Sequence, residues 1–290
     1  MTPWPTIKPI TLASLALLLT GCLRVEAEPL PLKILNWNVL YGFNHHKAIE
    51  EGSQWLREQK PDIIAFQELN GISENELAIH ARAWRHENAV THKEKGFPLG
   101  LTSKAPITVL ERKVEGFHHG YLHCKTYGIH FFVVHFWPGK FDETDKILSK
   151  TESLLAQGEN VIVLGDFNGC SRRDDTFLRN HATLRDIDYT FVDKVEAADF
   201  VDIIAKHDPQ AKVSCPSPIT IPRWTKNLEE LKQKQYRIDF IFADRQLAAR
   251  SITGTILLNK KLDHISDHYP VMIELERPQL EPLSNHNNKE

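Results

Sequence analysis

A short apolar run that ends in an acid and an amide constrains this chain more than any other stretch. Residues 161–168 read VIVLGDFN, so that four apolar, mostly β-branched residues lead into Gly165 and are followed by Asp166 and Asn168. Such a run bounded by a glycine is typical of a strand that is buried on both faces. Alternate side chains of a strand point the same way, so the carboxylate of Asp166 and the amide of Asn168 are expected to emerge together. This pair can hold a hard cation or a phosphate oxygen, although Asp and Asn are also common turn residues at strand ends.

The rest of the chain contains further strands with helices between groups of them. The predicted strands are 32–40, 62–66, 100–103, 107–114, 121–127, 129–136, 161–164, 237–242, 252–257 and 271–275, and the predicted helices are 47–58, 74–83, 141–157, 200–206 and 228–235. Helices and strands do not alternate strictly. This order favours two sheets packed face to face, with helices outside, over a doubly wound sheet.

The first 22 residues have the features of a signal peptide. Lys8 precedes a mostly apolar run at 10–19, which is too short to span a bilayer. The run ends in Leu19-Thr20-Gly21-Cys22, which resembles the lipobox of bacterial lipoproteins, whose cysteine is lipidated after cleavage. An ordinary cleaved signal peptide is the alternative, and in either case the mature chain lies outside the cytoplasm, membrane-anchored in the periplasm or at the cell surface, or else secreted. We therefore expect a lipoprotein signal peptide over 1–22, a tether over 23–31, one domain over 32–276 and a polar tail over 277–290.

Two bulk properties limit the possible functions and covalent links. The net charge of −3 excludes non-specific polyanion binding driven by bulk charge, but a local basic groove would be enough for a nuclease. Cys124, Cys170 and Cys215 remain in the mature chain, and an oxidising compartment permits one disulfide among them. We expect a Cys170–Cys215 bond, because one residue follows the Asp-Phe-Asn-Gly turn and the other lies in a proline-rich loop; three unpaired thiols are the alternative.

Polar residues recur at the ends of the predicted strands. They are Asn38, Glu68, His135, Asp166, Asn168, Asp267 and His268, while Asp239 lies inside the apolar run at 237–242. A single acid at a strand end is usually a turn residue, and a single histidine is usually a hydrogen-bonded surface group. Asp239 is different, because an acid between Ile238 and Phe240 is costly to bury unless it is paired or hydrogen-bonded.

Taken in order, these residues and their neighbours resemble the motifs of the endonuclease/exonuclease/phosphatase superfamily. The matching segments are Trp37-Asn38, Gln67-Glu68, His135, Gly165-Asp166-Phe167-Asn168, Arg237-Ile238-Asp239 and Ser266-Asp267-His268, and the resemblance runs from about residue 33 to 276. The superfamily includes pancreatic deoxyribonuclease, apurinic endonucleases, neutral sphingomyelinases and inositol polyphosphate phosphatases. The resemblance implies an α/β fold, a four-layer αββα sandwich of two mixed β-sheets with helices outside. It also implies an active site where the strand ends of the two sheets meet.

The resemblance further implies a metal site. Asn38 and Glu68 resemble the first metal ligands of the superfamily, with Asp267 contributing nearby. All three offer oxygen atoms, which suit Mg²⁺ or Mn²⁺ better than zinc.

The remaining motif residues correspond to catalytic groups. Asp239 resembles the carboxylate that orients His268 and stabilises its charged form. Asp166 and Asn168 would position the nucleophile and a phosphate oxygen, and His135 would contact the phosphate or protonate the leaving group. Either Asp166 or His268 could be the general base.

The expected function is therefore that of a metal-dependent phosphoric ester hydrolase that uses in-line attack by water. A monomeric phosphodiesterase or nuclease acting on nucleic acid or nucleotides is favoured, because extracytoplasmic scavenging suits an enzyme with a lipid anchor in the membrane. A sphingomyelinase-like phospholipid phosphodiesterase and an inositol-phosphate phosphatase are alternatives, and so is a catalytically inert binding lipoprotein. The other histidines receive no role; His45, His46, His118 and His119 are expected to be solvated loop residues, and the alternative is that they face the cleft.

Overall fold

The computed structural model describes residues 1–2, 30–181 and 187–277. The predicted lipidation site Cys22 lies outside the described residues, as do the rest of the signal peptide beyond residue 2, most of the tether, and the tail from residue 278.

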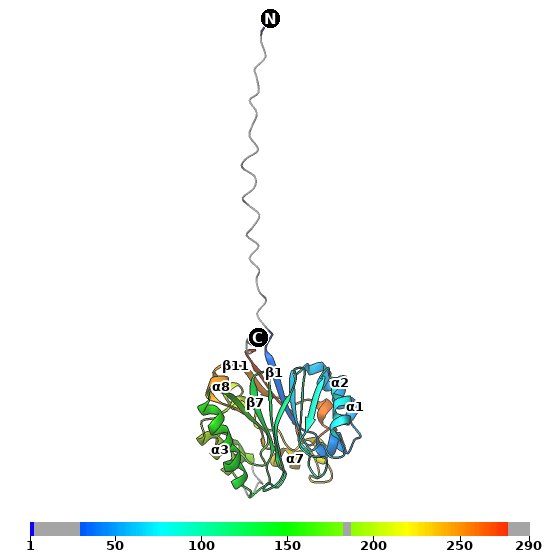
Figure 1. Ribbon diagram of the computed structural model, residues 1–290. Coiled ribbons are helices and arrows are strands. Elements are labelled where there is room, and N and C mark those ends of the chain that lie inside the picture. Colours follow the sequence, from blue (N-terminus) through cyan, green and yellow to red (C-terminus); the bar gives the residue numbers. More distant parts are fainter. Residues whose placement is uncertain (3–29, 182–186, 278–290) are drawn as a thin grey trace.

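Two six-stranded sheets lie face to face at the centre of the molecule (Figure 1). The first has the strand order β11 (Ser251–Ile256), β12 (Val271–Leu275), β1 (Leu32–Asn38), β2 (Ile63–Gln67), β4 (Gly100–Ser103) and β3 (Asn88–Thr91). The second has the order β5 (Thr108–Lys113), β6 (Tyr121–Thr126), β7 (Ile129–His135), β8 (Asn160–Asp166), β10 (Asp239–Ala243) and β9 (Val201–Asp202). The pairs β1–β2 and β7–β8 are parallel and the others are antiparallel, so both sheets are mixed.

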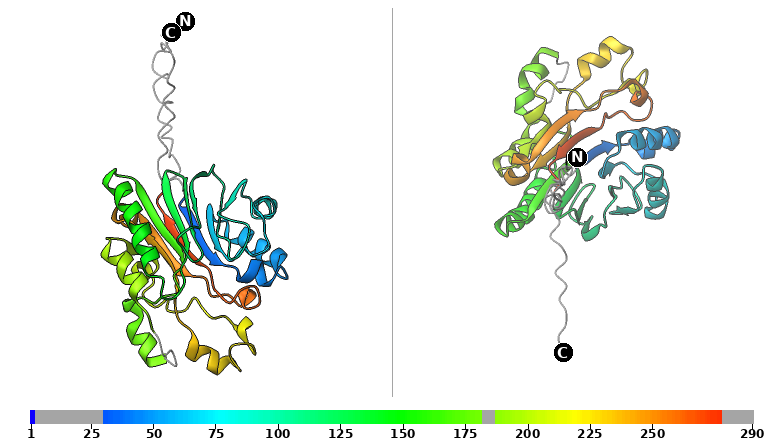
Figure 2. Two further views of the ribbon diagram at one scale, coloured as in Figure 1. Left: turned by 60° about the horizontal axis from the view of Figure 1, so that its bottom comes forward. Right: turned by 90° about the horizontal axis from the view of Figure 1, so that it is seen from above.

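Helices cover the outer faces of the two sheets, which gives the four-layer α/β sandwich that was predicted (Figure 2). On the side of the first sheet lie α1 (Ile49–Gln59) and α2 (Glu74–Ala83). On the side of the second sheet lie α3 (Asp142–Ala156) and α5 (Thr190–Ala197). The shorter helices are α4 (Asp175–His181), α6 (Ile203–His207), α7 (Leu228–Lys234) and α8 (Arg245–Ala249).

Strand β8 is buried on both faces, as its apolar run predicts. Ile162 and Leu164 belong to the large apolar cluster that includes residues of the first sheet. Val161 and Val163 belong to a second cluster, which includes residues of α3 and α5. Alternate side chains therefore face the other sheet and the outer helices, so the strand is fixed from both sides. A side chain at the end of this strand is therefore held by a rigid support.

Most predicted elements are present, with ends shifted by a few residues. The helix predicted over 200–206 is partly wrong, because residues 201–202 pair with β10 as strand β9 and α6 begins only at Ile203. Strand β3 and helices α4, α5 and α8 were not predicted. These elements are short, and short elements lack enough periodic positions to be recognised.

The predicted disulfide between Cys170 and Cys215 is wrong. Cys124, Cys170 and Cys215 are all buried free thiols. Cys170 and Cys215 belong to one small apolar cluster, but their sulfur atoms have different neighbours. The Cys215 thiol interacts with the His268 side chain, and the Cys170 thiol lies near the charges of Asp174 and Arg237. Burial raises the pKa of both thiols to about 12, so both stay protonated at neutral pH.

Within residues 30–181 and 187–277, no helix combines the length and the apolar character that crossing a membrane requires.

Candidate active site

The topology brings the ends of several strands to one end of the sandwich. In the first sheet, Asn38 at the end of β1 pairs with Gln67 at the end of β2, and Glu68 follows directly. In the second sheet, His135 at the end of β7 pairs with Asp166 at the end of β8. Parallel neighbours end at the same sheet edge, so each sheet presents its polar residues side by side.

Gly165 allows β8 to lie unusually close to β7. Its φ of +151° is in the region that favours glycine, and a Cβ atom at this position would lie 2.0 Å from the carbonyl oxygen of Val134. No side chain fits such a gap, since the obstacle is backbone. The glycine of the Gly-Asp-Phe-Asn motif is therefore required to place Asp166 beside His135.

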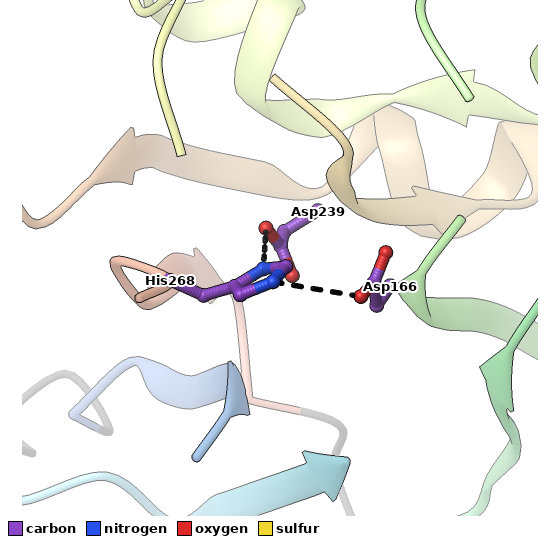
Figure 3. Close-up of side chains that lie close together, drawn as sticks. All are labelled: Asp166, Asp239 and His268. Carbon is purple, nitrogen blue, oxygen red and sulfur yellow. Dashed lines mark hydrogen bonds and ion pairs between the residues drawn. The ribbon is translucent and has the colours of Figure 1, made fainter. Parts of the chain in front are cut away.

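Asp166 lies at the centre of the cluster. Its Oδ2 accepts a hydrogen bond from Asn38 Nδ2 at 3.0 Å and lies 3.4 Å from His135 Nε2. The same oxygen is 3.7 Å from His268 Nε2, as Figure 3 shows. Its Oδ1 accepts from the backbone N–H of Asn168 at 2.9 Å. With only 2% of its surface exposed, this carboxylate joins residues from both sheets.

Asp239 and His268 form a hydrogen-bonded pair. His268 Nδ1 donates to Asp239 Oδ2 at 2.8 Å, which leaves Nε2 directed toward Asp166 (Figure 3). Asp239 is 1% exposed, and the pairing with His268 explains how an acid can occupy its apolar run. The other carboxylate oxygen of Asp239, Oδ1, has no hydrogen-bond partner among the described residues.

Two serines that received no role from the sequence hold this pair in place. Ser214 Oγ accepts from the backbone N–H of Asp239 at 3.2 Å. Ser266 Oγ accepts from the backbone N–H of His268 at 3.1 Å and donates to the carbonyl oxygen of Asn38 at 2.6 Å. Trp37 Nε1 also donates to the carbonyl oxygen of His268 at 2.9 Å. Ser266 and Trp37 lie inside the recognised motifs, but nothing in the sequence marks Ser214.

The two histidines differ sharply in their electrostatics. Burial opposes the charged form of His268, but the negative charges around it, that of Asp239 first among them, together outweigh burial and hold the pKa of His268 well above its usual value. Burial lowers the pKa of His135 well below its usual value, and His119 adds to this effect. Burial also raises the pKa of Asp166 to about 7, although the charge of His268 opposes the rise. At neutral pH, His268 is therefore charged and His135 is neutral.

Glu68, Asn38 and Asp267 offer oxygen atoms on the other side of Asp166. Asn38 Nδ2 donates to Glu68 Oε1 at 3.2 Å, and the backbone N–H of Tyr41 donates to Glu68 Oε2 at 3.1 Å. Burial raises the pKa of Glu68, and the charge of Asp267 raises it further. Burial likewise raises the pKa of Asp267. Two carboxylates that disfavour each other's charge, with an amide oxygen beside them, fit a hard divalent cation.

A second group of side chains also has ligand-like spacing. Atoms of Asp166, Asp239 and His268 lie within 4.8 Å of one another, the one such group of His, Cys, Asp or Glu residues in the described part of the chain. However, His268 carries a proton on Nδ1 for Asp239 and is held in its charged form. A charged imidazole has no lone pair for a metal, so this trio suits proton transfer and phosphate binding better.

A left-handed turn follows β1 at the edge of the site. Residues 40–46 all have positive φ, and only Gly42 among them is a glycine. This conformation destabilises each of the other residues by about 1–2 kcal/mol for steric reasons. Hydrogen bonds hold the turn, since Glu68 accepts from Tyr41 N–H and the carbonyl oxygen of Glu68 accepts from Gly42 N–H at 2.7 Å. Such strain is typical of functional sites.

The structure corrects the expectation that His119 is a solvated loop residue. His119 is 3% exposed, and its ring centroid lies 4.3 Å from that of His135. Its neighbour His118 is exposed, as expected, but stacks on Trp137 at 4.5 Å. These aromatic neighbours of His135 were missed because they come from a separate loop.

A cavity of about 690 Å³ opens beside Asn168. Its lining includes Pro138, Cys170, Tyr189 and Tyr236. This volume is within the range of small-molecule sites, so there is space for part of a substrate next to the catalytic cluster.

The structure thus brings together the residues that the sequence singled out. Asn38, Glu68, His135, Asp166, Asn168, Asp239, Asp267 and His268 lie at one end of the sandwich. Their individual roles remain predictions.

A family model and several solved structures match this chain. A model of the Endonuclease/Exonuclease/phosphatase family matches residues 35–268. The chain is similar to the structure of an AP endonuclease from Archaeoglobus fulgidus, with 21% identity, a TM-score of 0.62, and coverage of 84% of this chain and 99% of that one. No curated protein matches the chain significantly.

Two structures from Neisseria are similar over the same share of both chains, 84% and 99%. One is the 3' phosphatase NExo bound to a product DNA hairpin, with 16% identity and a TM-score of 0.63. The other is the 3'-5' exonuclease NExo from Neisseria meningitidis, with 16% identity and a TM-score of 0.59. Likeness at these identities shows the shared fold.

Proposed function

This chain belongs to the Endonuclease/Exonuclease/phosphatase family, and we propose that it is a divalent-metal-dependent phosphodiesterase that cleaves nucleic acid or nucleotides. One observation carries the proposal. Asp166 is buried between the neutral His135 and the charged His268, and Asn38 joins it to Glu68. This arrangement places a proton acceptor, a positive charge and cation-binding oxygens around one point, as hydrolysis of a phosphate ester requires.

Asn38, Glu68 and Asp267 are the residues that would hold Mg²⁺ or Mn²⁺. The raised pKa values of both carboxylates support this choice, because a cation would relieve their repulsion. When bound, the metal ion would polarise a phosphoryl oxygen and offset its growing negative charge.

Asp166 accepts a proton from the attacking water, and His268 stabilises the negative charge on the phosphate. His268 is fixed by Asp239 at Nδ1, so its Nε2–H is free to donate to a phosphate oxygen. Because His268 already carries its proton, Asp166 is the better acceptor for a proton from the attacking water. Asn168 Nδ2 donates to the carbonyl oxygen of Phe136 at 3.0 Å, which orients its amide at the end of β8.

Nucleic acid is the favoured substrate. The family includes nucleases, and the similar solved structures are an AP endonuclease and an exonuclease with 3' phosphatase activity, the latter bound to a DNA product. The cavity beside Asn168 supports the proposal, because it offers space for a group as large as a nucleotide.

We also propose that the enzyme acts outside the cytoplasm, anchored to a bacterial membrane by lipid on Cys22. The sequence at 19–22 supports this, since Leu-Thr-Gly-Cys follows an apolar run of signal-peptide length. Labelling of expressing cells with a radioactive fatty acid tests it. Loss of the label in Cys22→Ser is expected, and an unlabelled wild-type chain would contradict it.

The activity is tested with bis-p-nitrophenyl phosphate and p-nitrophenyl phosphate. Each is incubated with the mature chain in Mg²⁺, Mn²⁺ or EDTA. Metal-dependent release from the diester, followed by cleavage of DNA or RNA, is the expected result. Release from the monoester alone would replace the proposal with a phosphatase. Hydrolysis of sphingomyelin without hydrolysis of nucleic acid would replace it with a phospholipid phosphodiesterase.

A further inference from the structure

A continuous row of aromatic rings flanks the catalytic cluster. We call it the aromatic band, and it consists of Tyr41, His45, Phe97, His118, His119 and Trp137. Successive ring centroids lie between 4.5 and 5.6 Å apart. The rings come from four separate segments of the chain, so their alignment is a product of the fold.

The rings of the aromatic band contact His135, and the backbone of one of its residues, Tyr41, contacts Glu68. Phe97 contacts the ring of His135 edge-on at 5.9 Å, and His119 lies 4.3 Å from the same ring. At the other end, the backbone N–H of Tyr41 donates to the carboxylate of Glu68. A molecule whose phosphate is bound at Asp166 would therefore have the aromatic band directly beside it.

The outer rings of the band are exposed to solvent. Trp137 is 44% exposed and Tyr41 38% exposed, and His45 and His118 are exposed as well. His118 stacks on Trp137 with an interplanar angle of 22°, which orients the indole while almost half of it faces solvent. Packing explains the buried His119, but it does not explain why large apolar rings are held in contact with water beside an active site.

Hydrogen bonds fix the segments that carry the inner rings. His92 Nε2 donates to the carbonyl oxygen of His119 at 2.8 Å, and His92 Nδ1 accepts from the backbone N–H of Leu99 at 2.8 Å. Lys93 Nζ donates to the same carbonyl oxygen of His119 at 2.7 Å. The loop of Phe97 is thus tied to the loop of His119, and Lys93 adds a positive charge that suits a phosphate backbone.

We propose that the aromatic band is a subsite that stacks unpaired nucleobases of the strand being cleaved, so that the enzyme prefers single-stranded or frayed nucleic acid to an intact duplex. This inference rests on the proposed nuclease function and specifies its substrate. Every base has an apolar face that stacks on an aromatic ring, whatever the sequence. In a duplex those faces are already covered by neighbouring base pairs, and exposing them costs free energy.

Trp137 provides the sharpest test, because Trp224 is a matched control. Trp224 is 53% exposed and no ring contact places it in the aromatic band. The variants are Trp137→Ala, Trp137→Phe and Trp224→Ala. Two single-stranded DNA oligonucleotides of equal length serve as substrates with Mg²⁺, one with normal bases and one with abasic tetrahydrofuran units on both sides of the scissile phosphate.

For Trp137→Ala, we expect KM for the base-bearing oligonucleotide to rise about 5- to 150-fold, because stacking contributes about 1–3 kcal/mol per base. Its kcat, and its KM for the abasic oligonucleotide, should match those of the wild type. Trp137→Phe should restore most of the loss, and Trp224→Ala should behave as the wild type.

Three results would overturn the inference. Trp137→Ala could raise KM equally for both oligonucleotides, or for neither. The wild type could cleave duplex DNA with a lower KM than single strands. Finally, it could cleave glycerophosphocholine, with KM raised by Trp137→Ala, which would assign the aromatic band to a quaternary ammonium group. Failure of the proposed function is distinguishable, because the wild type would then cleave bis-p-nitrophenyl phosphate but no oligonucleotide.

Discussion

Asp166 and Asp239 are direct partners across the antiparallel pair of β8 and β10, at the last residue of one strand and the first of the other. Two carboxylates in this position repel each other. His268 relieves the repulsion, because its Nδ1 donates to Asp239 and its Nε2 lies 3.7 Å from Asp166. The positive charge that we propose for phosphate binding therefore also stabilises the pairing of the two strands that carry the acids.

His268→Ala should reduce kcat on a phosphodiester by about 10²- to 10⁴-fold, because it removes a positioned group that contacts the phosphate. The rate is measured with bis-p-nitrophenyl phosphate and Mg²⁺. His264→Ala is the matched control, since His264 lies in the same loop but is exposed and pairs with Glu51 on the surface. A turnover rate close to that of the wild type in His268→Ala would contradict the proposed mechanism.

Asp239→Asn should move the alkaline limit of activity to lower pH. The charge of Asp239 contributes most to raising the pKa of His268 well above its usual value, so His268 loses its proton at a lower pH once that charge is removed. In the wild type, charged His268 stabilises the fold fully below its unfolded pKa, and this stabilisation fades as pH rises through its folded pKa. The pH profile of kcat/KM measures the shift. An alkaline limb at the same pH in both proteins would contradict the assigned pairing.

Saturating Mg²⁺ or Mn²⁺ should raise the melting temperature, because a cation relieves the repulsion among the buried carboxylates. Ligand at 100 times its Kd stabilises a fold by about 2.7 kcal/mol, which for a domain of this size corresponds to about 5–10 °C. Differential scanning calorimetry measures the change. Glu68→Gln should weaken the response, and an unchanged wild-type curve would count against an assembled metal site.

Mild acid should destabilise the fold through buried neutral histidines. Burial lowers the pKa of His86 to about 4, and the same holds for His92, His119 and His123. The unfolded chain takes up these protons near pH 6.5 and the folded chain does not, so stability falls as pH drops from about 6.5 to about 4.

Urea unfolding at several pH values measures this loss. His86 Nε2 donates to the carbonyl oxygen of Pro61 and its Nδ1 lies 2.9 Å from Thr102 Oγ1, so no acid is hydrogen-bonded to its ring. His86→Gln should make the acid slope shallower by up to about 1.4 kcal/mol per pH unit, the value for one proton. Between pH 7 and 8 the difference between the two proteins should be constant. Parallel acid slopes would show that His86 titrates normally.

Arg237→Ala should destabilise the protein by about 3–5 kcal/mol, because it leaves the buried Asp202 without its counter-charge and leaves Asp174 paired with Lys212 alone. Arg237 donates to Asp174 at 2.8 Å and to Asp202 at 2.6 Å, and all three side chains are at most 1% exposed. Arg245→Ala is the control, because its pair with Asp199 is exposed and such pairs contribute about 0–1 kcal/mol. If both variants lost the same free energy of unfolding, burial would not determine how much these ion pairs contribute to stability.

The fold and the residues that gather at the candidate site could be predicted from local patterns. The buried strand β8 has a continuous apolar run, and the acids stand out because each follows or interrupts such a run. The order of the motifs then indicated the family. The fold class needed no more than this, since the strand and helix order already favoured two packed sheets.

Other features depend on contacts between distant segments and have no local signature. Ser214 looks like any loop serine, yet it accepts from the backbone N–H groups of Ile238 and Asp239. His119 was assigned to a solvated loop because its burial depends on Phe97 and His135, which lie elsewhere in the chain. The prediction of a disulfide between Cys170 and Cys215 was wrong for the same reason. Their positions in the sequence do not reveal which way each sulfur atom points.

The left-handed turn at residues 40–46 also predicts how the protein would respond to a D-amino acid. An L-amino acid is strained where φ is positive, whereas its mirror image is relaxed there. A semisynthetic protein with D-tyrosine in place of Tyr41 should thus be more stable than the natural one, and so should one with glycine. The D-residue directs its side chain differently and glycine has none, so either form would lose the ring contacts that Tyr41 makes with His45 and Phe97. At this position, the L-residue lowers the stability of the fold through steric strain and, in return, presents an exposed aromatic side chain.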